Sequence, residues 1–135
     1  MNPRKDNWPA LFNAYIEHRR DMPFAWGSHD CCMFAAEGVR AITGVDLGRS
    51  FRRRYKCARG AANVLRKFGG DVANIPGALG LPAIRPAQAG RGDVVCYEFN
   101  GRNTLGLCCG LQSVFVAPHG LMFVQTLACT AAWKV

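Results

Sequence analysis

The spacing of apolar residues changes along the chain, from a helical period in the first half to short strands in the last third. Helices are predicted over residues 7–20, 31–43 and 57–68. Apolar residues that recur at i, i+3 and i+4 share one helix face. In the first predicted helix these residues are Trp8, Leu11, Phe12, Tyr15 and Ile16.

The second predicted helix has clear start and stop signals. Ser28 or Asp30 can cap its first turn, and Gly44 is a common C-terminal signal. Gly38 lies on its apolar face and would permit close packing against a neighbouring element. The residues that share this face are Cys31, Phe34, Ala35, Gly38 and Ile42.

The last third of the chain has the pattern of a small antiparallel sheet. Short strands are predicted over residues 93–99, 104–109, 113–117, 121–126 and 131–135, the last at an edge. Asn100-Gly101 is a strong signal for a two-residue hairpin turn. The Gly- and Pro-rich stretch 71–92 is predicted to be a long surface connection. Helices followed by an antiparallel sheet indicate an α+β fold, with N-terminal helices packed on a small C-terminal sheet.

The length of 135 residues fits one domain, so we expect residues 1–135 to fold as a unit. No apolar stretch is long enough to span a bilayer. The first ten residues include Arg4, Lys5 and Asp6 and lack the apolar run of a signal peptide. The sequence therefore predicts a protein that is made in a cytoplasm and has no membrane span.

The chain has seven cysteines, an odd number that argues against a disulfide framework in an unsecreted protein. The more specific alternative is that the cysteines bind zinc or an iron–sulfur cluster. Such sites usually contain a C-x-x-C motif, and the sequence has none. The vicinal pairs Cys31–Cys32 and Cys108–Cys109 are poor chelates, since neighbouring side chains on a strand point to opposite faces. Most of these thiols are interpreted as small buried apolar groups, and no metal or cofactor is predicted.

Positive charge is concentrated in residues 49–67, called the basic segment below. It holds eight cations and no acid, whereas the rest of the chain has nine cations and nine acids. The basic segment can contact nucleic acid, an anionic wall polymer or the acidic face of a partner, or it can be a solvated helix face. Its central residues Arg52, Arg53 and Arg54 are candidate binding residues. Nucleic acid ranks last, because no stacking platform or nucleic-acid motif accompanies the charge.

Cys31 is the cysteine whose position indicates a chemical role, since it lies at the predicted start of the second helix. A helix N-terminus stabilises a thiolate and lowers its pKa. A thiol with a lowered pKa and a positioned base is a nucleophile. The neighbouring Asp30 is an anion that opposes this effect.

Three segments resemble the motifs of NlpC-type cell-wall cysteine peptidases. Residues 24–31 (Phe-Ala-Trp-Gly-Ser-His-Asp-Cys), followed by Phe34, resemble the nucleophile segment, where an aromatic-Trp-Gly run leads to Asp-Cys at a helix start. Residues 91–95 (Arg-Gly-Asp-Val-Val) resemble the Gly-Asp-hydrophobic strand of the family. Residues 105–107 (Leu-Gly-Leu) and Gly110 resemble its next strand. The order and spacing of the three segments agree with the family over most of the chain.

The resemblance implies a papain-like fold with Cys31 as nucleophile and backbone N–H groups of its helix as part of the oxyanion hole. The family places its catalytic histidine directly before the hydrophobic-Gly-hydrophobic run, where this sequence has Thr104. Threonine cannot accept the thiol proton at useful pH. The third polar residue should fall near Val116 or Ala117, and neither can orient an imidazole. The resemblance therefore implies a peptidase framework that has lost catalysis.

The three histidines of the chain are the alternative bases. His18 lies beside two arginines on the first helix and is interpreted as a surface residue. His29 is two residues from Cys31, too near in sequence for good geometry, and we expect a loop or cap role. His119 lies at a strand turn beside Pro118 and is the candidate base, although a plain turn role is favoured.

Phe24 and Trp26, in the loop before the second helix, are candidate binding residues. They can line a substrate cleft or a partner groove. The favoured interpretation is that they are core residues that pin this loop, since aromatic side chains dominate core burial.

The sequence as a whole also resembles small phage proteins from tail gene modules, whose related modules carry an NlpC-type peptidase at the tail tip. This resemblance implies a virion protein of the tail tip or of tail assembly, made in the host bacterial cytoplasm. Its implied partners are other tail proteins and peptidoglycan. The alternative is an active cysteine endopeptidase or amidase that cuts peptidoglycan during phage entry, with Cys31 as nucleophile.

Overall fold

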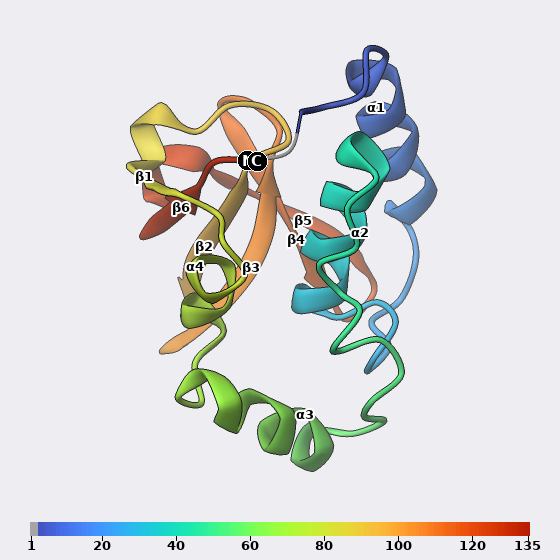
Figure 1. Ribbon diagram of the computed structural model, residues 1–135, viewed down its shortest axis with the longest axis vertical. Helices are drawn as coiled ribbons and strands as arrows, with labels where there is room; N and C mark the ends of the chain where they lie inside the picture. Colours follow the sequence, from blue (N-terminus) through green and yellow to red (C-terminus); the bar gives the residue numbers. More distant parts are fainter. Residues whose placement is uncertain (1–2) are drawn as a thin grey trace.

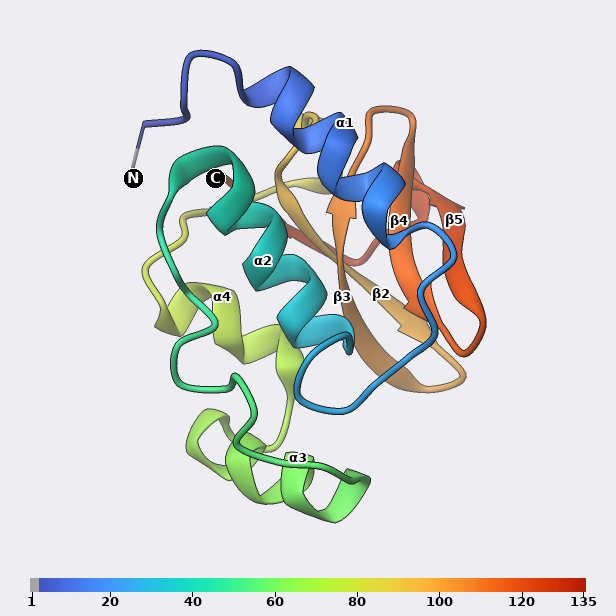
Figure 2. The same ribbon diagram turned by 90° about the vertical axis from the view of Figure 1, so that its right-hand side faces the viewer.

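A computed structural model describes residues 3–135, and its first half is helical, as the apolar spacing predicted. The three main helices are α1 (Trp8–Arg19), α2 (Cys31–Thr43) and α3 (Ala58–Leu65). Helices α1 and α2 pack side by side, while α3 lies at the far end of the molecule (Figures 1 and 2). No helix in this described range is long and apolar enough to cross a bilayer.

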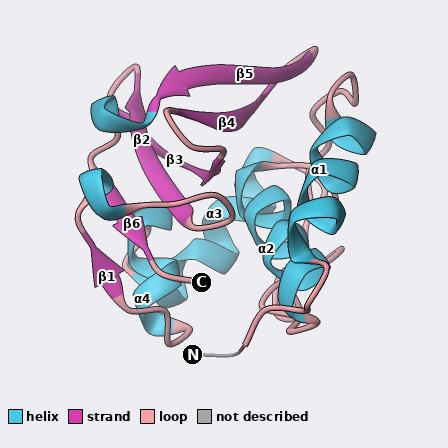
Figure 3. Cartoon of the chain, turned by 90° about the horizontal axis from the view of Figure 1, so that it is seen from above, coloured by secondary structure: helices cyan, strands magenta, loops and turns pink. Residues whose placement is uncertain are grey.

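Five strands from the last third and one short strand at residues 83–84 form a single six-stranded sheet, as expected for an α+β fold. The strands are β1 (Ala83–Ile84), β2 (Val94–Phe99), β3 (Arg102–Cys108), β4 (Gln112–Ala117), β5 (Gly120–Gln125) and β6 (Ala131–Trp133). Their order is β1-β6-β2-β3-β4-β5, and all neighbours are antiparallel. Seen from above, the strands fill one half of the molecule and α1 and α2 the other (Figure 3).

The turn between β2 and β3 is the two-residue hairpin that the sequence predicted. Asn100 and Gly101 have φ angles of 51° and 78°. A turn with two positive φ angles matches the right-handed twist of the strands that it joins, and Asn-Gly is the dipeptide that best tolerates it. This turn sets the register in which Tyr97 lies opposite Thr104.

The prediction that residues 71–92 form a surface connection was wrong. This segment contains short 3₁₀ turns at Val72–Asn74 and Pro86–Gln88, the one-turn helix α4 (Ile75–Ala78), and β1. Val72, Ile75 and Pro76 are buried. Glycines and prolines divide the segment into short pieces, but the apolar side chains between them still pack on the core. Strand β1 pairs with β6, so β6 lies between β1 and β2 and is not the predicted edge strand.

Helix α2 is the element that packs most closely on the sheet. A Cβ atom added to Gly38 would lie 2.3 Å from Cδ1 of Leu107, so glycine allows this approach of α2 to β3 without displacing the Leu107 side chain. The helix ends at Gly44, which has a left-handed φ of 82°. The position of α2 against β3 in turn fixes its first residue, Cys31, beside the middle of the sheet.

Asp93 holds the two ends of the chain together. Its side chain is fully buried and accepts hydrogen bonds from the backbone N–H groups of Val135 and Gly90, both at 2.9 Å. The Arg4 guanidinium donates to it at 2.9 Å as well. A buried carboxylate needs such partners, because removing it from water is costly. Asp93, the acid of the Gly-Asp-hydrophobic motif, therefore ties the start of β2 to residues near both ends of the chain.

The seven cysteines are free thiols. Cys96, Cys108 and Cys129 are buried, as expected for small apolar side chains, whereas Cys57 is exposed. Burial raises the pKa of Cys129 to about 11, so this thiol stays protonated at neutral pH. Within residues 3–135, no cluster of three or more histidine, cysteine and acidic side chains could hold a metal ion.

Candidate functional site

Asp30 caps α2 and is fixed by three donors. Its Oδ1 accepts from the backbone N–H of Met33 at 2.9 Å. Its Oδ2 accepts from the N–H of Gly27 at 2.8 Å and from the hydroxyl of Tyr55 at 2.6 Å. The residue is 3 % exposed. The carboxylate is thus occupied by structural hydrogen bonds, and it holds the first turn of α2 in place.

Cys31 follows as the first residue of α2 and is half-buried. Its sulfur lies 3.9 Å from that of Cys32. A hydrogen bond from the Cys32 thiol, aided by one from the backbone N–H of Leu105, holds the pKa of Cys31 below its ordinary value, against the opposing effects of burial and Asp30. The same hydrogen bond and burial raise the pKa of Cys32. Cys31 is therefore the more acidic thiol of the pair.

A cavity of about 200 Å³ lies at the start of α2 and is lined by Cys31 together with Thr104 of β3 and Val116 of β4. The peptidase resemblance placed the base and its orienting partner at these two positions. The structure thus brings the three motif positions to one place, with a hydroxyl and an isopropyl group in place of the two polar groups. No imidazole is found among the lining residues of the described chain.

The histidines lie elsewhere. His29 is 2 % exposed, and its Nδ1 lies 2.8 Å from a guanidinium nitrogen of Arg19. Burial and Arg19 lower the pKa of His29 to about 4, so the ring is neutral at neutral pH. His119, the candidate base, is exposed in the turn between β4 and β5 and does not line the cavity. His18 is exposed on α1, as expected.

Phe24 and Trp26 form an aromatic wall of the cavity. Their rings meet edge to face with centroids 4.7 Å apart, and the Trp26 ring lies 6.3 Å from that of Tyr55. Trp26 is 41 % exposed, so it is not the core residue that the favoured interpretation expected. A half-exposed indole beside a cavity offers a flat apolar surface to a ligand.

The basic segment forms another wall of the same cavity. Five of its residues line it: Phe51, Tyr55, Ala61, Val64 and Leu65. A helix with an inward apolar face was predicted in this segment, but its contact with the Cys31 cavity was not, because that contact joins residues far apart in the sequence. Ala61, Val64 and Leu65 have the i, i+3, i+4 spacing of one helix face, and this spacing was the sequence signal available for the helical part of the wall.

The three candidate arginines of the basic segment differ in role. Arg52 pairs with Asp46 at 2.8 Å and with Glu37 of α2. These hydrogen bonds raise the pKa of Arg52 and tie the basic segment to α2. Arg53 and Arg54 are exposed instead, and the backbone N–H of Arg53 donates to Gly27 at 3.0 Å. Only the latter two arginines are free to meet a ligand through their guanidinium groups.

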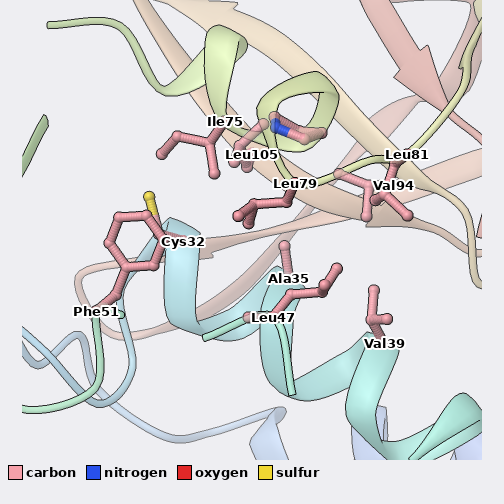
Figure 4. Close-up of a pocket in the computed structure, with 12 residues that line it drawn as sticks. Cys32, Ala35, Val39, Leu47, Phe51, Ile75, Leu79, Leu81, Val94 and Leu105 are labelled. Atoms are coloured by element: carbon pink, nitrogen blue, oxygen red, sulfur yellow. The ribbon is translucent and has the colours of Figure 1, made fainter. Parts of the chain in front are cut away.

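A second, apolar cavity of about 30 Å³ lies on the other side of Cys32, between α2 and the segment around α4 (Figure 4). Ile75, Leu79 and Leu81 point into it from one side, and Ala35 and Val39 of α2 from the other (Figure 4). Its space is that of about one or two water molecules, and its lining offers them almost no polar partner. We interpret it as imperfect packing of the core.

Comparisons with known proteins agree with this geometry. A family model described as a domain of unknown function, DUF6950, matches residues 3–135. Among solved structures, RipD from Mycobacterium tuberculosis is similar over 97 % of this chain and 99 % of that chain, with 18 % sequence identity and a TM-score of 0.51. RipD is described as a non-catalytic NlpC/p60 domain protein with an adaptation to peptidoglycan-binding function. No curated protein matches the sequence. At this identity the similarity shows the fold, which is NlpC/p60-like, as the sequence motifs implied.

Proposed function

The chain belongs to the DUF6950 family, and we propose that it binds peptidoglycan without cleaving it, as a virion protein of a phage tail tip or of tail assembly. One observation carries the loss of catalysis: the cavity that Cys31 lines has Thr104 and Val116 at the two positions where the base and its partner are expected. A thiol nucleophile needs a base within hydrogen-bond reach. Asp30, the acid among the described lining residues, cannot take this part, because its carboxylate already accepts from three donors.

Retention of the cavity supports a binding role. A framework that had lost all function at this place would be free to fill the space with larger side chains. The cavity instead keeps about 200 Å³ of space and an aromatic wall that includes the half-exposed Trp26. RipD, which is described as a peptidoglycan-binding and non-catalytic protein, is a precedent for this combination on the same fold.

The phage tail role is supported by the sequence resemblance to small proteins of tail gene modules. This support is an analogy with proteins that share the fold and are encoded in such gene modules. On this proposal the chain is made in the host cytoplasm and then joins the virion, where other tail proteins are its neighbours. Mass spectrometry of purified virions of the phage that encodes the chain tests this part, and absence of its peptides from the particles would refute it.

Two assays on the purified protein test binding and catalysis separately. Sedimentation with insoluble peptidoglycan should bring the wild type down, and Trp26→Ala should weaken this binding because it removes the exposed aromatic wall. A zymogram on the same peptidoglycan should show no clearing by the wild type above that by Cys31→Ala. Failure of the wild type to sediment would contradict the proposed function.

The alternative function is an active cysteine endopeptidase or amidase that cuts peptidoglycan during phage entry. It is favoured by one observation, the lowered pKa of Cys31 at the start of a helix. On this alternative the base comes from outside the cavity lining, for example from His119. Clearing of the zymogram that disappears in Cys31→Ala would establish the alternative, and its further loss in His119→Ala would identify the base.

A further inference from the structure

Most of the exposed cations of the described chain lie in the segment that forms one wall of this cavity. Residues 47–70 contain no acid, and Arg52 is the one arginine of the segment paired with carboxylates in the described structure. The remaining cations of the basic segment are exposed: Arg49, Arg53, Arg54, Lys56, Arg59, Arg66 and Lys67. A set of like charges without nearby acids produces a positive potential over the surface that they share.

These cations alternate in sequence with the residues that line the cavity. Arg54 and Lys56 flank Tyr55, which lines it, and Arg66 follows Leu65, which also lines it. The backbone at Arg53 packs on Gly27, the neighbour of Trp26, since a Cβ atom on Gly27 would lie 3.5 Å from Cα of Arg53. The exposed cations therefore lie in the same segment as one wall of the cavity, and several are direct sequence neighbours of residues that line it.

Asp30, the one acid among the described residues that line the cavity, does not offset this charge for a ligand. Asp30 is 3 % exposed, and its two oxygens already accept three hydrogen bonds. The lining is otherwise mostly apolar, so a ligand meets an apolar interior and a cationic rim. A molecule that fits this arrangement carries an apolar part for the cavity and carboxylates for the rim.

We propose that the basic segment makes this cavity selective for wall peptides with free carboxylates over the same peptides with amidated carboxyl groups. This inference rests on the proposed function, which supplies the peptide, and it adds the chemical group that is recognised. A short peptide suits the site better than a nucleic acid strand, because Trp26 is the one exposed aromatic side chain among the described residues that line the cavity, whereas binding of a strand relies on successive stacking platforms.

The test is a titration of the protein with two fluorescent wall peptides of identical sequence, one with free carboxylates and one amidated. We expect the wild type to bind the free acid about tenfold more tightly at low salt, with a preference that shrinks as salt is added. Arg53→Gln/Arg54→Gln should lose most of the preference. The charge-matched control, Lys5→Gln/Arg85→Gln, changes two exposed cations near α1 and β1, away from α3, and should keep it (Figure 1).

The outcomes separate this inference from the proposed function. Equal affinity for the two peptides, or an unchanged preference in Arg53→Gln/Arg54→Gln, overturns the inference and leaves peptide binding standing. Binding of neither peptide overturns both. Tighter binding of a single-stranded oligonucleotide than of either peptide at physiological salt overturns the inference in favour of a nucleic acid partner. Thermal unfolding of each variant confirms that these exposed substitutions leave the fold intact.

Discussion

The hydroxyl of Tyr55 donates a 2.6 Å hydrogen bond to the carboxylate of Asp30, 25 residues earlier in the chain. This contact joins the basic segment to the residue that precedes Cys31. Burial and this hydrogen bond raise the pKa of Tyr55, so the phenol remains a donor at all relevant pH values. The cavity wall and the cap of α2 are therefore one hydrogen-bonded unit.

Tyr55→Phe should destabilise the protein by about 1–2 kcal/mol, because it leaves a buried carboxylate with one donor fewer. The matched control is Tyr97→Phe, which changes a half-buried tyrosine whose hydroxyl has no partner within residues 3–135. Urea unfolding followed by circular dichroism measures both. Equal loss of stability in the two variants would show that the hydroxyl of Tyr55 has no special role.

Cys31 should react with iodoacetamide at lower pH than an ordinary thiol, whose pKa is about 8.5. The hydrogen bond from Cys32 is the largest cause of the lowered pKa, so Cys32→Ala should move the pH profile of Cys31 alkylation upward. Tandem mass spectrometry locates the adduct, and Cys57→Ala, which removes an exposed thiol, is the control. A profile that does not change in Cys32→Ala would contradict the proposed hydrogen bond.

Gly106→Ala should destabilise the sheet at the place where β3 meets β4. A Cβ atom at this position would lie 2.3 Å from the carbonyl oxygen of Val114, which is backbone and cannot move aside easily. We expect a loss of about 1–3 kcal/mol in the free energy of unfolding. Gly77→Ala is the control, since nothing lies within 4 Å of its added Cβ, and it should change stability by less than about 0.5 kcal/mol. Similar urea midpoints for the two variants would refute the close contact.

Features that depend on neighbours in sequence were predictable. The end of α2 at Gly44 and the turn at Asn100-Gly101 follow from local backbone preferences. The meeting of Cys31, Thr104 and Val116 at one cavity followed from the order and spacing of family motifs, although no local rule links these residues.

Features that depend on distant parts of the chain were not predictable. Burial of Val72 and Ile75 is decided by the core that they meet, and a segment rich in glycine and proline gives no sign of it. The pairing of Arg52 with Glu37 joins residues 15 positions apart through a loop. The contact of the basic segment with the Cys31 cavity also joins residues far apart in the sequence, so its role as a cavity wall emerged only from the structure.

The stability of the protein should fall as the pH drops from about 6.5 to about 4, in part because of His29. Its pKa is about 4 in the folded protein and about 6.5 in the unfolded chain, mainly through burial and then through Arg19. Between these values the unfolded chain binds a proton that the folded protein does not, so the contribution of His29 is full above pH 6.5 and is lost on acidification. The loss is at most about 1.4 kcal/mol per pH unit, and it stops below pH 4, where both states are protonated.

Other groups also titrate in this range, so the test is the difference between the wild type and His29→Asn. An asparagine oxygen can replace Nδ1 as the acceptor for Arg19, but the amide has no proton to gain. Urea unfolding at a series of pH values between 4 and 7 should give a shallower pH dependence for His29→Asn than for the wild type. Parallel curves would mean that the folded protein protonates His29 as readily as the unfolded chain, and that this imidazole is not held neutral by its burial beside Arg19.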